Sequence, residues 1–438
     1  MRQLHLNLFI YTCGHHRAAW RHPQSSVERL GDMRYYEELA QAAERAKLDA
    51  VFFADGQYFG NVEDGPQWFL EPLTMLGPLA CATEKIGLIS TVSSTFQTPF
   101  NAARMLSSLD HISGGRVAWN VVTSMYDVEA RNHGYESMPE HAWRYERAVE
   151  FITSVQQLWD SWADEALVLD RAGKYAESTL VQPIHHHGKH FLVDGPLTIP
   201  RSPQGHPVLF QAGASEQGRN TAAQLAEAIY AVAYDLPAAQ SYYRDVKRRI
   251  KAAGRNVNVP IMPGLVTYVA STHEEALRKQ RELDELLPTE NSLRQLGMFI
   301  AQDCSDWELD APVPTLPPLE TFTGPKGRYS TILRIIETES PTLRQLLGRL
   351  AAGGGHCTMV GTPDVIADQM EYWFCNEGAD GFNLMPPALP FSFTDFAEQV
   401  IPLLQQRGLF RTEYTGSTLR EHLGLARPSS THNANIST

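Results

Sequence analysis

The sequence predicts a (β/α)8 TIM barrel, because eight short apolar strands alternate with amphipathic helices along most of its 438 residues. The segment 49–55, DAVFFAD, is almost continuously apolar, as expected for a parallel strand that is buried on both faces. A doubly wound open sheet has the same alternation, but no G-x-G-x-x-G pattern follows the first strand. We therefore expect one α/β domain with insertions over residues 1–425, followed by a polar tail at 426–438.

The first half of the chain supplies four strands and four helices. The strands are expected at 5–11, 49–55, 86–95 and 116–123, and the intervening helices at 35–47, 72–81 and 100–109. The fourth helix, at 141–162, carries a stripe at the helical period: Tyr145, Ala148, Val149, Ile152, Val155 and Trp159. Residues 163–204, rich in glycine, proline and histidine, break this rhythm, and we expect a hairpin excursion there.

The second half resumes the alternation. Strands are expected at 208–210, 228–234, 261–270 and 381–384, and helices at 238–253, 274–287, 365–377 and 393–407. Between them, residues 289–358 contain proline clusters, the sequence TGPKGR, a GGG run and short helical pieces, so we expect a long, irregular insertion that is either a functional lid or a mobile segment. The polar tail is expected to fray.

Composition excludes several classes of function. The formal net charge of −13 argues against a nucleic-acid surface, which would need a basic stripe. The five cysteines are far apart, odd in number and without a Cys-x-x-Cys pair, which is typical of a reducing compartment. No apolar run is long enough to span a membrane, and no basic leader precedes an apolar segment. We expect a soluble, cytoplasmic protein that binds neither nucleic acid nor membrane.

Polar residues follow several of the apolar strands, at the end of a barrel where active sites are built. Asp55 ends the second strand, the third contains Thr91, and the fourth contains Asn120 and leads to Ser124. Each could simply cap its strand, but together they suit a planar ligand that has many heteroatoms and a phosphate.

The stretch GHPVLFQAGASEQGRNTAAQLA, residues 205–226, indicates where that phosphate would lie. It combines a strand, a glycine turn and a helix start, with Ser215 at the N-cap position. Free N–H groups and the positive end of the helix dipole favour an anion there, although an ordinary capped loop has the same pattern. His141 and Tyr145 stand four residues apart on one helix face and could hold the phosphate from the other side, unless Tyr145 only continues the core stripe.

Two other clusters suggest chemistry. Cys13, His15 and His16 close the first strand and could line a substrate pocket; Cys13 and His16 are the candidates for proton transfer. The histidines at 185, 186, 187 and 190 invite a metal hypothesis, but no cysteine or acidic partner stands at ligand spacing, so we expect no metal site.

The chain resembles bacterial luciferase-like flavin monooxygenases. Four stretches carry the resemblance: SSTFQTPFNAARMLSSLDHISGGRVAWNVVTS, HAWRYERAVEFI with LWDSW, GKHFLVDGPLTIPRSPQGHPVLFQAGASEQGR, and VGTPDVIADQM. They are most similar to the branch that includes nitrilotriacetate monooxygenase component A, dibenzothiophene-sulfone monooxygenase and long-chain alkane monooxygenase.

The resemblance implies a two-component oxidoreductase. Reduced FMN, supplied by a separate NAD(P)H:FMN reductase, would react with O2 to form a C4a-(hydro)peroxide that oxygenates a small organic substrate. The flavin-binding positions carried over by motif are Asp55, Thr91, His141, Tyr145 and Ser215. Asn120 and Ser124 are expected beside the isoalloxazine ring. A homodimer or homotetramer is also implied.

The substrate is predicted only by class. We expect Cys13, His15, His16, Tyr58 and Met125 to line its pocket, with Phe59 and Trp68 adding aromatic surface and Arg17 able to accept a carboxylate. Met125 stands where the alkane-oxidising relative has a histidine, which disfavours alkane hydroxylation. The mixture suits a carboxylated amine, a thioether or a sulfone, oxygenated with C–N or C–S cleavage. Two alternatives stay open: an F420-dependent dehydrogenase of the same superfamily, and a non-catalytic flavin-binding accessory protein.

Overall fold

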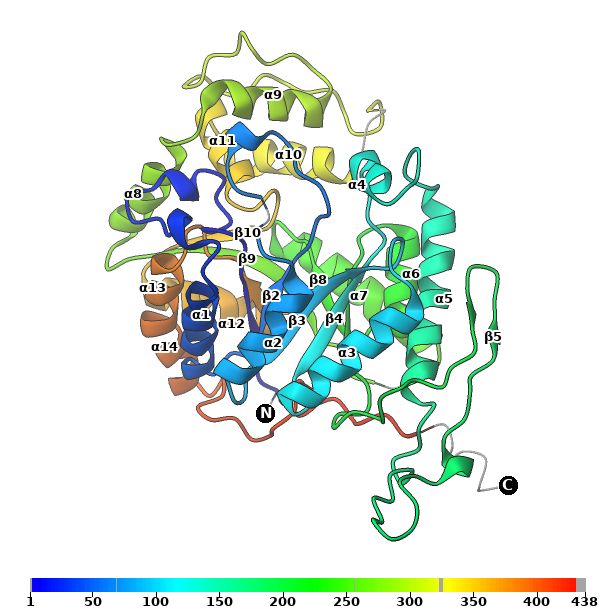
Figure 1. Ribbon diagram of the computed structural model, residues 1–438. Coiled ribbons are helices and arrows are strands. Elements are labelled where there is room, and N and C mark those ends of the chain that lie inside the picture. The colour runs from blue at the N-terminus through cyan, green and yellow to red at the C-terminus, as the bar shows by residue number, and fades with distance from the viewer. Residues whose placement is uncertain (1, 68, 256, 323–325, 431–438) are drawn as a thin grey trace.

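The computed structural model describes residues 2–67, 69–255, 257–322 and 326–430. Eight parallel strands close into a barrel, which confirms the predicted fold (Figure 1). In hydrogen-bonded order they are β1 (His5–Phe9), β2 (Ala50–Phe53), β3 (Gly87–Ser93), β4 (Val117–Val122), β7 (Val208–Ala212), β8 (Ala228–Ala231), β9 (Ile261–Val269) and β11 (Gly381–Leu384). The register between β11 and β1, from His5 opposite Gly381 to Leu8 opposite Leu384, completes the circle.

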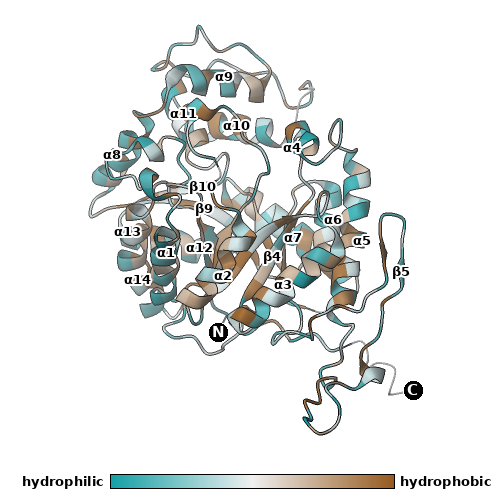
Figure 2. Cartoon of the chain, viewed as in Figure 1, coloured by the Kyte–Doolittle hydropathy of each residue, from teal (hydrophilic) through white to brown (hydrophobic). Residues whose placement is uncertain are grey.

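Helices surround the barrel, and Figure 2 shows hydrophobic colours gathered on the strands while peripheral helices such as α8 are hydrophilic. The surrounding helices are α1 (Met33–Arg45), α2 (Pro72–Ala82), α3 (Pro99–Ser113), α4 (Asp127–Asn132), α5 (His141–Trp159), α6 (Glu216–Leu225), α7 (Leu236–Ala252), α8 (His273–Asp284), α12 (Pro363–Cys375), α13 (Phe391–Gln399), α14 (Ile401–Gln406) and α15 (Leu419–His422). The prediction of a single helix at 393–407 is wrong, because this segment forms two helices, α13 and α14. Pro402 lies in the first turn of α14, where a new helix begins.

The insertion is more regular than expected. It folds into α9 (Thr289–Ile300), α10 (Lys326–Glu339) and α11 (Leu343–Ala351), which gather at one end of the barrel (Figure 1). These helices share a hydrophobic cluster of their own, built from residues such as Leu293, Leu296, Ile332 and Leu346. An unpredicted strand, β10 (Cys357–Gly361), follows them and pairs in parallel with β9.

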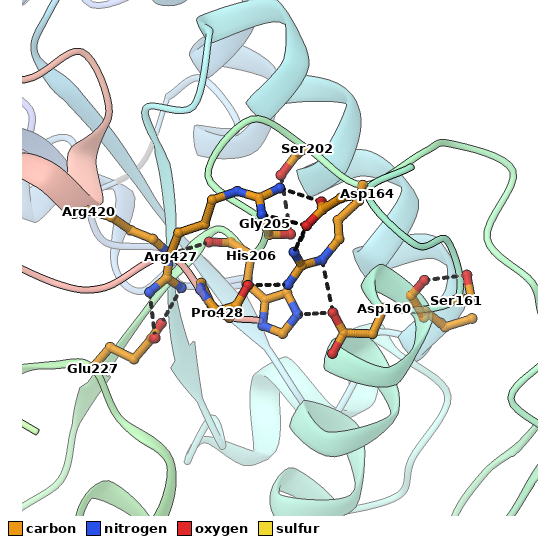
Figure 3. Close-up of polar contacts among 12 residues, drawn as sticks. Asp160, Ser161, Asp164, Ser202, Gly205, His206, Glu227, Arg420, Arg427 and Pro428 are labelled. Atoms are coloured by element: carbon orange, nitrogen blue, oxygen red, sulfur yellow. Dashed lines mark hydrogen bonds and ion pairs between the residues drawn. The ribbon is translucent and has the colours of Figure 1, made fainter. Parts of the chain in front are cut away.

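The excursion at 163–204 contains a two-stranded antiparallel pair, β5 (His186–His187) and β6 (Leu192–Val193). It ends near the chain's C-terminal segment. Arg201 contacts Asp160, Asp164 and the carbonyl of Pro428. Arg427 pairs with Asp164 at 2.5 Å, and Figure 3 labels both residues. The expectation of a frayed tail is therefore wrong for residues 426–430, and residues 431–438 lie outside the described part.

Carboxylates close the amino-terminal end of the barrel. The residue just before β2, Asp49, accepts the N–H of Leu6 in β1 at 2.7 Å. Glu227, just before β8, accepts the N–H of Leu209 in β7, and Asp380, just before β11, accepts the N–H of Ile261 in β9, both at 3.0 Å. Each carboxylate also meets a cation: Arg411, Arg420 and Lys247 respectively. The same arrangement, a carboxylate that accepts a main-chain N–H and pairs with a cation, therefore fixes this end of the barrel at three places.

Candidate active site

A cavity of about 380 Å3 lies where β2, β4 and β7 end. Its lining includes Asp55, Tyr58, Thr123, Ser124, Met125, Tyr126, Glu129, Tyr145, Gln211 and Ala212. The structure therefore brings together five of the residues singled out in the sequence: Asp55, Tyr58, Ser124, Met125 and Tyr145. Larger cavities, of about 710 and 830 Å3, lie beside α8 and α13 and along α9, and neither is lined by any predicted site residue.

Thr91 and Asn120 are register partners in β3 and β4, and both are buried. The Thr91 hydroxyl donates to the carbonyl of Phe53 at 2.9 Å, and the Asn120 Nδ2 donates to the Thr91 Oγ1 at 3.1 Å. Within the described residues, Asn120 Oδ1 and the Gln211 Oε1 are buried acceptors without a hydrogen-bond partner. Because leaving a buried acceptor unsatisfied costs about 1–3 kcal/mol, the pair is suited to a ligand that donates hydrogen bonds.

The start of α6 forms a second corner of the site. Ser215 Oγ accepts the N–H of Gly218 at 3.1 Å, so it is the N-cap that the sequence predicts, and it donates to Tyr145 Oη at 3.4 Å. The rings of His141 and Tyr145 lie 4.7 Å apart. A Cβ on Gly213 would lie 2.8 Å from the Gly218 Cα, so the turn can approach the helix this closely only with glycine. These groups suit a phosphate.

The loop after β2 is held by residues that sequence reasoning missed. Glu129 of α4 accepts the N–H of Gln57 at 3.2 Å and those of Met125 and Tyr126 at 3.3 Å, which ties this loop to the loop after β4. Burial raises the pKa of Asp55, against a lowering contribution from the Gln57 amide that donates to it at 3.3 Å. A carboxyl group that lies in a cleft and has a raised pKa is typical of functional sites.

Ser124 adopts a left-handed backbone conformation, with φ 52°. Its carbonyl accepts from the buried Arg144, and its hydroxyl lies 2.9 Å from that of Ser93. The only signal for Arg144 in the sequence was its place between His141 and Tyr145. Strain in the backbone of a non-glycine residue at a strand end is common in binding sites, where the surroundings hold it.

The three predicted residues after β1, Cys13, His15 and His16, lie in different surroundings. Cys13 is 1% exposed and burial raises the pKa of its thiol, while His16 Nε2 lies 3.1 Å from Asp284 and its Nδ1 accepts the N–H of Ala18. Neither residue is among those that line the cavity. Because both nitrogens of His16 have partners within the protein, neither is left for a substrate.

His15 belongs to a different group, which sequence reasoning missed. Its ring packs against Phe9 of β1, whose ring in turn packs on that of Tyr230 in β8, and Tyr230 Oη lies 3.1 Å from the Nε2 of His356. Burial lowers the pKa of His15 to about 4 and that of His356 to about 3, so both imidazoles are neutral near pH 7. A Cβ on Gly264 would lie 2.4 Å from His356 Nδ1, so this glycine makes room for the imidazole.

Three further sequence predictions concern other surfaces. His186 pairs with Glu150 at 3.0 Å, and no described group of three or more histidine, cysteine, aspartate or glutamate side chains is arranged to hold a metal. Phe59 is 45% exposed, and Trp68 lies outside the described residues. None of the helices in the described segments has the length and apolar character that a membrane crossing requires.

Comparisons with known proteins agree with this geometry. Residues 8–381 match the luciferase-like monooxygenase family. The sequence is 43% identical to nitrilotriacetate monooxygenase component A of Aminobacter aminovorans over 98% of this chain and 97% of that protein. The structure resembles EDTA monooxygenase from Chelativorans sp. BNC1, with a TM-score of 0.83 and 33% identity over 98% of this chain and all of that one. It also resembles a riboflavin lyase solved with modified FMN and riboflavin, with a TM-score of 0.83 and 31% identity over 98% and 97% of the two chains.

Proposed function

The chain belongs to the luciferase-like monooxygenase family, and we propose that it is the oxygenating component of a two-component system that uses FMNH2 and O2. One observation carries the proposal. Among the described residues, one barrel combines two buried acceptors without partners, Asn120 Oδ1 and Gln211 Oε1, with the corner formed by Ser215, Tyr145 and His141. A flavin mononucleotide has both a ring system with hydrogen-bond donors and a phosphate.

The residues fit the cofactor in two parts. Ser215, Tyr145 and His141 would hold the phosphate at the start of α6, where the helix dipole favours an anion. Asn120, Gln211 and Asp55 would receive hydrogen bonds from the flavin ring, and the Asn120 amide is oriented for this by Thr91. When bound, the flavin would supply oxygen activation at its C4a position.

The remaining task of the chain is to exclude water and to orient the substrate. The rings of Tyr58 and Tyr126 lie 4.9 Å apart along the cavity, and Glu129 fixes both of their loops. We propose that these rings, with Met125, form the wall of the substrate space, and that α9, α10 and α11 act as its lid. His15 stays neutral and places no cation in this part of the barrel.

We propose a small carboxylated amine or thioether as substrate, with a sulfone as the next candidate. Two relatives are named for nitrilotriacetate and EDTA, which are both carboxylated amines. These names support a carboxylated amine as the substrate of this chain. Hydroxylation of the carbon next to nitrogen would give a carbinolamine, which collapses to an amine and an aldehyde and so breaks the C–N bond. A separate NAD(P)H:FMN reductase would supply the reduced flavin, as the designation "component A" of the relative suggests. Assembly into a dimer or tetramer is part of the same proposal.

A stopped-flow experiment tests the cofactor proposal. Protein mixed with photoreduced FMN and oxygenated buffer is expected to reoxidise the flavin more slowly than free FMN, because the enclosed site protects the reacting ring from water. A carboxylated amine or thioether that is a substrate should accelerate the final phase. Reoxidation at the rate of free FMN would contradict the proposal. Preferential binding of F420 would then favour the dehydrogenase, and binding of FMN without substrate oxidation would favour the accessory protein.

A further inference from the structure

Arg328 lies in α10, within the insertion. Its Nη2 lies 3.3 Å from the point that a Cβ on Gly354 would occupy, so the guanidinium rests on the glycine turn before β10. The charge of Arg328 contributes to lowering the pKa of His356, and Arg328 itself interacts electrostatically with Tyr126. His356 belongs to the β10 side of the mouth, and Tyr126 lines the cavity after β4. The contact with Gly354, two residues before His356, places the guanidinium on the β10 side of the opening.

Three other arginines of the insertion have carboxylate partners, and the fourth, Arg294, donates to the amide oxygen of Asn291 at 2.7 Å. Arg334, Arg344 and Arg349 pair with Asp235, Asp310 and Glu339 at 2.7, 2.8 and 2.9 Å. Across the described segments, by contrast, Arg328 has neither a hydrogen bond nor an ion pair. Its observed contact is with the ring of Phe299, 4.5 Å from its Cζ. A guanidinium held by an aromatic face keeps its N–H edges available for a carboxylate.

We propose that Arg328 binds a carboxylate of the substrate and so makes the site selective for anionic compounds. The proposal deepens the function proposed above and rests on it. A protein of net charge −13 repels polycarboxylates, so a local cation at the entrance is needed to attract and orient one. A planar guanidinium can bind both carboxylate oxygens at once, which fixes the orientation of the substrate as well as its charge. The nearby imidazoles of His15 and His356 are neutral, and Arg17, which the sequence suggested as a carboxylate ligand, donates instead to Gln295 of α9.

The test measures carboxylate binding directly. Nitrilotriacetate, S-(carboxymethyl)cysteine and glutarate, each beside its methyl ester, are titrated calorimetrically into the full-length protein loaded with FMN. Wild type is expected to bind one or more of the carboxylates and to prefer them to the esters. Arg328→Gln should weaken that binding about 10- to 100-fold, the loss expected for a charged hydrogen-bonded pair. Arg328→Lys should recover part of it, because lysine keeps the charge without the fork.

Arg334→Gln is the matched control, since it makes the same change in the same helix at a residue paired with Asp235, and it should leave carboxylate binding unchanged. FMN affinity, measured by fluorescence in every variant, separates the two proposals. Loss of carboxylate binding with intact FMN affinity supports the role of Arg328. That role is overturned if the wild type does not prefer carboxylates to esters, or if Arg328→Gln and Arg334→Gln lose carboxylate binding equally. In either case, normal flavin reoxidation would leave the proposed function standing. Loss of FMN affinity in Arg328→Gln alone would assign the guanidinium to the cofactor instead.

Discussion

Asp49→Asn is expected to lower the free energy of unfolding by about 3–5 kcal/mol, the usual cost of breaking a buried ion pair. Asp49 is fully buried and accepts from Leu6 N–H, from Arg411 at 2.5 Å and from His5 at 3.2 Å. The substitution leaves the Arg411 guanidinium without its counter-charge next to the start of β2. Urea unfolding at pH 7, followed by circular dichroism, measures the change.

The same carboxylate predicts a pH dependence. Burial alone would raise the pKa of Asp49, but Arg411, His5 and the Leu6 N–H lower it to about 2 from the usual 3.8. A depressed pKa contributes stability that is complete above the unfolded value and is lost as pH falls from about 4 through about 2. Asp49→Asn should abolish this part of the acid sensitivity.

Asp368→Asn is the matched control, because Asp368 pairs with Arg407 at an exposed position and such pairs are worth about 0–1 kcal/mol. Equal destabilisation by the two substitutions would show that the buried pair is not what stabilises this end of the barrel.

Ser215→Ala combined with His141→Ala is expected to weaken FMN binding by more than about 100-fold, because each change removes one proposed hydrogen bond to the charged phosphate, worth about 1.5–3 kcal/mol. Removal of the cap of α6 costs only about 1 kcal/mol of stability, so the protein should remain folded. Fluorescence titration with FMN measures the affinity, and circular dichroism monitors the fold.

Thr272→Ala provides the comparison. Thr272 caps α8 through the N–H of Glu275, as Ser215 caps α6, but it belongs to no part of the proposed site. It should lower stability by a similar amount and leave FMN affinity intact. Wild-type affinity in the Ser215 and His141 double variant would remove the phosphate assignment.

The barrel strands were predictable from the sequence because buried parallel strands are apolar and polar residues follow them, as in DAVFFAD. Asp55 and Ser124 were predictable as neighbours for the same reason, since each follows a strand that ends at the same rim, whereas Met125 was expected there from the family resemblance. By contrast, β10 has half-buried residues alternating with buried ones, follows a glycine run and pairs with β9 outside the circle of eight. Such a short strand has little signal of its own.

The insertion was likewise expected to be less regular than it is. Its prolines and glycines suggested irregular chain, yet Tyr329, Ile332 and Ile335 recur at helical spacing in α10 and are fully or almost fully buried. The proline clusters delimit the helices rather than prevent them. Long-range pairs were beyond sequence reasoning altogether: His16 contacts Asp284 across 268 positions, and Tyr230 contacts His356 across 126 positions. Such contacts depend on the tertiary fold and leave no local signal in the sequence.

The carboxylates of Asp49, Glu227 and Asp380 have a consequence for how the protein can diversify. They fix strand register at the end of the barrel opposite the cavity, through bonds to main-chain N–H groups that do not depend on the identity of the partner side chain. Segments at the other end, including the loop after β2 and the helices α9 to α11, can therefore be exchanged between homologues without disturbing strand alignment. New substrate ranges can arise by exchange of those segments while the amino-terminal end of the barrel stays unchanged.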